Sequence, residues 1–211
     1  MDITQILNGL SGCIFDELTE YNVYDNVVSN LSKMVYSGGY DTGATKLVLY
    51  PVNSDIVVKI PLQGEGVDTF SSFEGATEPE HWDYCRVEAG LYQKAEAAHV
   101  EVFFAKTEFI GYVNGFPVYI QPIVEIFNET RSVEDYEEDL RENTKDTCNK
   151  LEVNCFNTCW LCDFLDYYGE DELLQLSQFL INNCIGDLHG GNLGYLEDGT
   201  PVIVDYSDYW E

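Results

Sequence analysis

Two acidic residues and one amide near the end of the chain have the types and spacing that phosphoryl transfer requires. Asp187 and Asn192 are five residues apart in Asp187-Leu188-His189-Gly190-Gly191-Asn192, and Asp205 follows the apolar run Val202-Ile203-Val204. A carboxylate can orient an attacking hydroxyl and accept its proton, while carboxylate and amide oxygens can hold Mg²⁺ on the transferred phosphate. We therefore expect these three side chains to converge on one site.

The same stretch resembles the catalytic loop of protein-kinase-like enzymes. It is similar to the D-L-H-x-x-N form of aminoglycoside phosphotransferases and related bacterial or phage kinases, and Asp205-Tyr206-Ser207 is similar to the metal-binding D-F-G element of protein kinases. The resemblance implies that Asp187 is the catalytic base and that Asn192 and Asp205 are ligands of Mg²⁺. His189 lies inside the motif, and we expect its imidazole to brace the loop.

A lysine in the first half of the chain supplies the phosphate contact that this resemblance implies. Val57-Val58-Lys59-Ile60 is similar to the V-A-I-K element of protein kinases, so Lys59 is expected to contact the α- and β-phosphates of ATP. In that family a Glu on the following helix holds the lysine. Glu88 is the predicted partner of Lys59, and Glu96 is the alternative.

Two further segments are expected to hold the rest of the nucleotide. The stretch 37–43 is predicted to lie between the first two strands, where glycines would let backbone amides approach the phosphates, and it contains Gly38, Gly39 and Gly43. The end of the fifth predicted strand corresponds to the hinge between lobes in the family. Backbone groups of Gln121 and Ile123 are expected to bind the adenine edge there.

The elements that must position these residues predict an α+β fold. Five segments have the composition and turn signals of strands, and the pair Asn114-Gly115 predicts a hairpin between the last two. They are residues 34–39, 45–50, 55–60, 107–112 and 117–124. A helix is expected at 81–98, because one of its faces is apolar. The order β-β-β-α-β-β predicts an antiparallel sheet of five strands with one helix.

The remaining segments are predicted to be mainly helical. One or two short helices are expected before residue 34, an exposed acidic helix at 132–146, and further helices at 157–168 and 171–183, followed by a hairpin of 193–196 with 202–206. With the resemblance, this predicts one protein-kinase-like, bilobal domain over residues 1–211. Its parts are an N-terminal extension (1–33), a sheet lobe (34–124) and a reduced, mainly helical lobe (125–211).

These features predict an ATP- and Mg²⁺-dependent kinase that transfers the γ-phosphoryl group to a hydroxyl. Only six residues follow Asp205, so the helices that form the sugar pocket of antibiotic kinases are not expected. A Ser or Thr of a protein is therefore the expected acceptor. The sequence also departs from the family, with Ile185 at a position usually held by His and with Asp-Tyr-Ser in place of D-F-G. An inactive pseudokinase is the alternative that these departures leave open.

Charge narrows the range of partners. Ten Lys and Arg against 38 Asp and Glu give a net charge of −28 at pH 7, which repels nucleic acids and anionic membranes. The same charge can mimic a nucleic-acid backbone, so an acidic protein that sequesters a DNA-binding partner is a further alternative. No apolar run approaches the roughly 20 residues of a membrane crossing, and a cytoplasmic protein is expected, in a bacterium or in a host cell.

The cysteines are expected to be reduced thiols, because their number, seven, is odd and because no leader segment is evident. Cys155, Cys159 and Cys162 fall on one face of a predicted helix among apolar residues. Buried apolar thiols are the favoured interpretation, and a zinc site that also includes Cys148 is the alternative.

Overall fold

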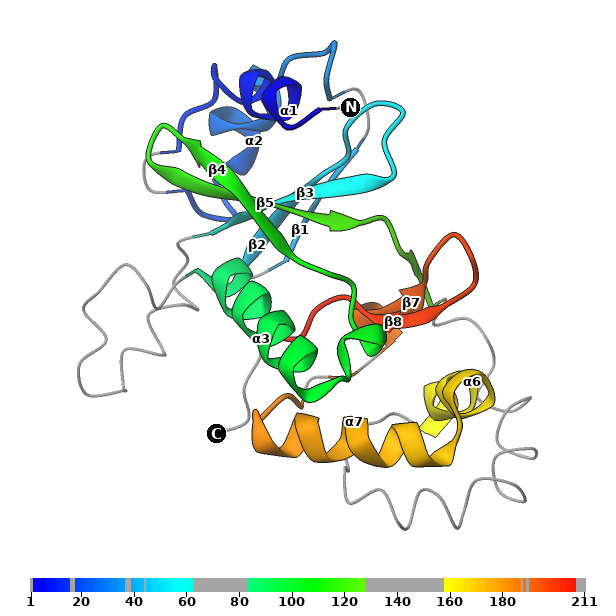
Figure 1. The fold of residues 1–211 in the computed structure, drawn as a ribbon. Helices are drawn as coiled ribbons and strands as arrows, with labels where there is room; N and C mark the ends of the chain where they lie inside the picture. The colour runs from blue at the N-terminus through cyan, green and yellow to red at the C-terminus, as the bar shows by residue number, and fades with distance from the viewer. Residues whose placement is uncertain are drawn as a thin grey trace, which may run out of the picture. The chain divides into compact units, whose positions relative to one another are not determined.

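A computed structural model gives the fold of the chain (Figure 1). It describes residues 2–15, 18–36, 39–43, 45–62, 83–127, 158–186, 188 and 190–207. The fold is mixed α+β and contains the predicted five-stranded antiparallel sheet. By its internal contacts the chain divides into two compact units, Met1–Ala89 with Thr107–Ile123 (unit 1) and Gly90–Lys106 with Val124–Glu211 (unit 2).

The sheet of unit 1 has the strand order β1-β2-β3-β5-β4, with every neighbouring pair antiparallel. Its strands are β1 (Tyr40–Thr42), β2 (Lys46–Leu49), β3 (Ile56–Pro61), β4 (Glu108–Val113) and β5 (Phe116–Pro122). The β4–β5 hairpin turns at Asn114 and Gly115, both of which have positive φ, as the Asn-Gly pair predicts.

The predicted first strand at 34–39 is wrong, because β1 begins at Tyr40. Residues before it form a turn whose Tyr36 is buried and donates its hydroxyl to the carbonyl of Ile6 (3.1 Å), so long-range packing takes the place of strand pairing. The stretch 37–43 is consequently not a loop between the first two strands. Gly39 precedes β1, Gly43 begins the short β1–β2 turn, and Gly38 lies outside the described residues.

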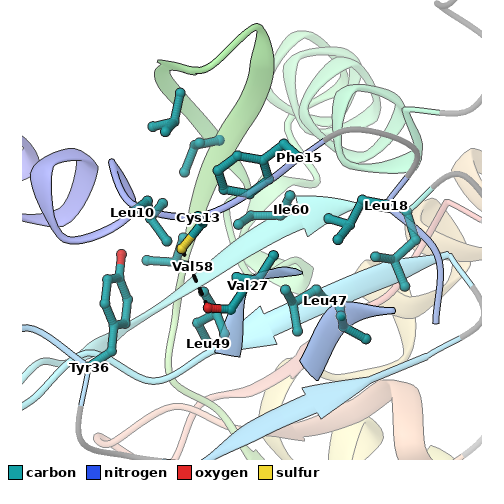
Figure 2. Packing of buried hydrophobic residues seen from close by; sticks show 14 of the residues in the cluster. Leu10, Cys13, Phe15, Leu18, Val27, Tyr36, Leu47, Leu49, Val58 and Ile60 are labelled. Atoms are coloured by element: carbon teal, nitrogen blue, oxygen red, sulfur yellow. Dashed lines mark hydrogen bonds between the residues drawn. The ribbon is translucent and has the colours of Figure 1, made fainter. Parts of the chain in front are cut away.

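The N-terminal segment covers one face of this sheet with apolar side chains (Figure 2). It contains α1 (Ile3–Gly9), α2 (Val23–Asn26) and a 3-10 turn, η1 (Val28–Asn30), which agree with the predicted short helices. Side chains alternate between the two faces of a strand. Leu47, Leu49, Val58, Ile60 and Val118 therefore join the N-terminal residues in one core.

The opposite parity of β2, β3 and β5 carries buried polar side chains beside apolar ones such as Val57. Lys46, Lys59 and Gln121 are on this parity and are buried. The helix α3 (Tyr84–Ala98) follows β3 in the chain, and its first residues belong to unit 1. Asp83 accepts the backbone N–H of Arg86 (2.9 Å), the geometry of a helix N-cap, which fixes where α3 begins.

Unit 2 combines helices with a small antiparallel sheet of order β6-β7-β8. Its elements are η4 (Glu101–Phe103), β6 (Glu125–Ile126), α6 (Thr158–Tyr168), α7 (Glu170–Asn182), η5 (Gly190–Asn192), β7 (Leu193–Tyr195) and β8 (Pro201–Ile203). Two predicted helices are confirmed to within about one residue, and the final hairpin is confirmed although its second strand ends three residues earlier than predicted. The strand β6 was not predicted, and a Cβ at Gly194 would collide with Glu125 of β6, so glycine permits this close pairing.

Some expectations concern residues that the structure does not describe. The predicted acidic helix at 132–146 lies outside the described residues, as do Cys148 and Cys155 and the side chains of Cys159 and Cys162. Within the described ranges, every helix is too short or too polar to cross a lipid bilayer.

Candidate functional site

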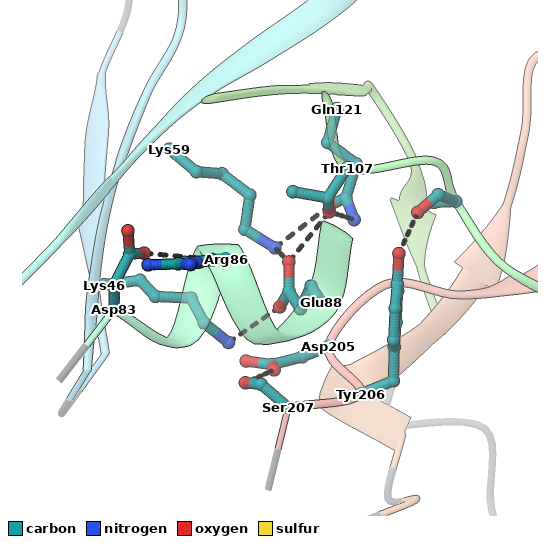
Figure 3. Close-up of polar contacts among 11 residues, drawn as sticks. Lys46, Lys59, Asp83, Arg86, Glu88, Thr107, Gln121, Asp205, Tyr206 and Ser207 are labelled. Carbon is teal, nitrogen blue, oxygen red and sulfur yellow. Dashed lines mark hydrogen bonds and ion pairs between the residues drawn. The ribbon is translucent and has the colours of Figure 1, made fainter. Parts of the chain in front are cut away.

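Five polar side chains of unit 1 form a connected, buried group, which we call the Lys59 cluster: Lys46, Lys59, Glu88, Thr107 and Gln121 (Figure 3). Lys59 Nζ lies 2.7 Å from Glu88 Oε2, and Lys46 Nζ lies 2.7 Å from Glu88 Oε1. Both carboxylate oxygens of Glu88 are thus engaged by lysines. The first turns of α3 bring Glu88 against the polar face of the sheet.

Thr107 and Gln121, the other two members of the cluster, form hydrogen bonds to the ion pair of Lys59 and Glu88. The Thr107 hydroxyl donates to Glu88 Oε2 (2.8 Å), and the Gln121 amide donates to Thr107 Oγ1 (3.0 Å). Lys59 Nζ also donates to Gln121 Oε1 (3.3 Å). This closed ring of hydrogen bonds holds the Lys59 ammonium group in one place, because each of its described partners is itself held by another.

Burial of the charged groups of the Lys59 cluster carries a large free-energy cost. Glu88 has no exposed surface, and Lys46 and Lys59 are each 4% exposed. Removing charged groups from water costs several kcal/mol per ion, and only close pairing with good hydrogen bonds offsets that cost. A buried polar arrangement of this kind is unusual in a sheet whose other face packs into an apolar core. It is therefore the best candidate for a functional group in unit 1.

The sequence analysis predicted part of this cluster. The Lys59–Glu88 contact is present as predicted, whereas the alternative Glu96 is exposed. Lys46 and Thr107 were missed. Lys46 could have been noticed because it shares the strand face of Lys59 when the two strands are aligned, but that alignment requires the register of β2 and β3.

A second buried contact ties α3 to the sheet. The Tyr119 hydroxyl on β5 donates to Asp83 Oδ2 (2.6 Å), while Asp83 Oδ1 caps the helix. Burial raises the pKa of the Asp83 carboxyl, although its hydrogen bond to Tyr119 acts in the opposite direction. Burial, together with the bond to Asp83, also raises the pKa of Tyr119 far above its ordinary value. Because Glu88 lies on the second turn of α3, this contact helps to position it.

The end of β5 only partly fits its predicted role. The backbone N–H of Ile123 donates to the carbonyl of Asp55 (2.8 Å), so this donor is occupied within unit 1. The Gln121 side chain belongs to the Lys59 cluster, a role that the sequence did not indicate. Gly39 and Gly43 have open space where a Cβ would be, so neither position requires glycine on steric grounds.

In unit 2 the structure brings the predicted metal ligands Asn192 and Asp205 to the same end of one hairpin. Asn192 immediately precedes β7 and Asp205 follows β8 by two residues. The backbone N–H of Val204 donates to the carbonyl of Asn192 (2.9 Å), which extends the β7–β8 ladder to Asn192 and to the residue before Asp205. Asp205 Oδ1 accepts the hydroxyl of Ser207 (3.1 Å; Figure 3).

The residues around this pair are firmly held. Tyr206 is buried, donates its hydroxyl to the carbonyl of Ala105 (3.0 Å) and packs edge-on against Phe104 at 4.9 Å. Asn192 is itself buried. The predicted base Asp187 and the neighbouring His189 lie outside the described residues, while Leu188 between them is buried.

The donor set at this hairpin end suits a hard cation. One carboxylate and one amide supply oxygen ligands, and Mg²⁺ is commonly held by one or two protein oxygens with phosphate and water completing its coordination. Within the described ranges no three His, Cys, Asp or Glu side chains gather as a metal cluster. Of the described residues, Asn192 and Asp205 are the two whose side-chain oxygens we assign to such a cation.

No protein-family model matches the chain, and no curated protein matches it.

Proposed function

We propose that the chain is an ATP- and Mg²⁺-dependent phosphotransferase with a protein-kinase-like, bilobal fold. The observation that carries the proposal is the buried ion pair between Lys59 on β3 and Glu88 on α3, at 2.7 Å. In this class of enzyme a lysine on the third strand contacts the phosphates and a glutamate on the next helix orients it. The strand order β1-β2-β3-β5-β4, with α3 between β3 and β4, supports the same assignment.

The residues of unit 2 have complementary roles in this proposal. Asn192 and Asp205 would hold Mg²⁺, which neutralises charge on the transferred phosphate when bound. Their positions at one end of the β7–β8 hairpin support a shared ligand role. Asp187 would orient the acceptor hydroxyl and take its proton, as the resemblance of the loop to the D-L-H-x-x-N motif implies.

The acceptor class that we propose is the hydroxyl of a protein Ser or Thr. In this step the acceptor oxygen would bond to the γ-phosphorus and its proton would go to the Asp187 carboxylate. The bond between the γ-phosphorus and the bridging oxygen would break, and ADP would leave with that oxygen.

Incubation with γ-labelled ATP and Mg²⁺ tests the function directly. Label in the protein itself or in an added mixture of basic and neutral protein substrates is expected for the wild type, with a loss of at least a hundredfold for Asp205→Ala. Asp198→Ala is a matched control, because Asp198 is an exposed carboxylate of the β7–β8 turn. Equal labelling by the wild type and Asp205→Ala would refute the proposal.

A second candidate function, an acidic binding protein without turnover, is favoured by the net charge of −28. The electrostatic field of this negative charge attracts basic partners at long range. The two candidates separate in one measurement, since a binding protein gives no thermal shift with Mg²⁺-ATP but sequesters a DNA-binding protein in a salt-dependent manner. A Lys59→Met variant should leave that sequestration unchanged if the chain is a binding protein, and should weaken the binding of Mg²⁺-ATP if the chain is a phosphotransferase.

A further inference from the structure

Thr107, the residue before β4, has a hydroxyl that joins the helix α3 to the strand β5 inside the Lys59 cluster. The side chain is buried, with 2% of its surface exposed. Its Oγ1 lies 2.8 Å from Glu88 Oε2 and 3.0 Å from the amide nitrogen of Gln121. Figure 3 shows that Thr107 meets Glu88 and Gln121 beside the ammonium group of Lys59.

The chemistry of these groups fixes the direction of each hydrogen bond. An ammonium group can only donate, so the amide atom of Gln121 that faces Lys59 must be the oxygen. The amide nitrogen then faces Thr107 and donates to its Oγ1. An ionised carboxylate can only accept, so the single hydroxyl proton of Thr107 goes to Glu88. Thr107 thus accepts from the strand side and donates to the helix side.

The oxygen that Thr107 contacts is the one that also contacts Lys59. Both bonds go to Glu88 Oε2, whereas Lys46 contacts Oε1. Thr107 is attached to the sheet through its neighbour Glu108, which pairs with Ile120 of β5. Hydrogen bonds to ionised groups are about twice as strong as neutral ones. The Thr107 hydroxyl therefore ties the carboxylate oxygen beside Lys59 to the sheet.

We propose that Thr107 is a positioning residue of the phosphotransferase, whose hydroxyl fixes the Glu88 carboxylate and thereby the place of the Lys59 ammonium group. This inference rests on the proposed function, because it states how the lysine of that site is oriented. Thr107 acts through Glu88 and does not touch the nucleotide in this role. A displacement of about 1 Å in a reacting geometry can lower a rate about a hundredfold, so one buried hydroxyl can matter to turnover.

The first measurement is kcat/KM for ATP in the labelling reaction of the full chain. Thr107→Val removes the hydroxyl and keeps the branched shape of the side chain. Loss of one hydrogen bond to a charged group corresponds to roughly tenfold to a hundredfold, and kcat/KM is expected to fall by that factor. Thr107→Ser keeps the hydroxyl and should retain most of the activity. Thr107→Ala should behave as Thr107→Val does, so the test does not depend on the folding of one variant.

The second measurement observes the Lys59 ammonium group by ¹⁵N-edited NMR, with its signal assigned by its loss in Lys59→Met. The signal is expected to shift in Thr107→Val and to keep its wild-type position in Thr107→Ser. A general loss of stability would not produce this difference in the folded protein. Thr19→Val is the matched control, because Thr19 is a half-buried threonine of the same unit outside the cluster. It should change neither the signal nor kcat/KM.

The outcomes separate this inference from the proposed function. If the wild type labels substrate and the variants Thr107→Val and Thr107→Ala do so with the same kcat/KM, the inference is refuted while the proposed function stands. The same holds if Thr107→Ser loses as much activity as Thr107→Val, or if the Lys59 signal does not move in Thr107→Val. A wild type that labels no substrate refutes both.

Discussion

Removing the charge of Glu88 should destabilise the protein more than any other single substitution in the Lys59 cluster. Glu88→Gln keeps the shape of the side chain but leaves two buried ammonium groups facing a neutral amide. At 2.7 Å and an effective dielectric constant of about 20, each ion pair has a Coulomb energy of roughly 6 kcal/mol before desolvation is counted. Breaking a buried pair by removing one partner typically costs about 3–5 kcal/mol, and we expect a loss in this range.

The assay is equilibrium unfolding in urea, followed by circular dichroism, with the free energy of unfolding compared between variants. Glu96→Gln is the matched control, because it makes the same chemical change on the same helix at an exposed position, where surface substitutions change stability by about 0.5 kcal/mol or less. A double variant, Glu88→Gln with Lys46→Met, should recover part of the loss, since it removes one of the two ammonium groups that face the neutral amide.

The reasoning would be refuted if Glu88→Gln lowered the free energy of unfolding no more than Glu96→Gln does. It would also be refuted if the double variant were less stable than Glu88→Gln by the full cost of Lys46→Met alone, because the two changes would then be independent.

Two other perturbations test the surroundings of the cluster. Tyr119→Phe removes the hydroxyl that donates to Asp83 at 2.6 Å, and urea unfolding should show a loss of about 1.5–3 kcal/mol; a stability equal to wild type would contradict a positioning role for this bond. Burial raises the pKa of the Cys13 thiol to about 11, so above about pH 9 the unfolded chain releases this proton before the folded chain does. The free energy of unfolding should therefore fall as pH rises from 9 to 11, and Cys13→Ala should lack that part of the fall; parallel pH profiles of the two proteins would argue against it.

Local signals predicted the parts of the fold that depend on few residues. The hairpin at Asn114-Gly115 was predicted because only a few residue types adopt positive φ easily, and both residues do so here. The helix α3 was predicted from its apolar face, although its start was placed three residues early. The first strand was misplaced, since the side chain of Tyr36 is held by the carbonyl of Ile6, 30 positions away.

For the candidate site too, local sequence signals predicted some features, and long-range packing decided the others. The motif similar to V-A-I-K places Lys59 on a strand, and its acidic partner is then expected on the following helix. Glu88 and Glu96 are both on that helix, α3, and their positions are about 12 Å apart along its axis. Only the packing of α3 on the sheet selects Glu88. The convergence of Asn192 and Asp205 was predictable, because a short hairpin necessarily brings its two ends together.

The sequence by itself determined the Asn114-Gly115 turn, most of the helices and strands and the chemistry available in the motif residues, because these depend on local backbone preferences and side-chain types. The tertiary structure alone decided that Lys46 shares Glu88 with Lys59 and that Thr107 and Gln121 complete the ring. Those contacts join residues between 14 and 62 positions apart. Strand register and helix docking bring such residues together, and both arise from the burial of whole faces, which no single stretch of sequence specifies.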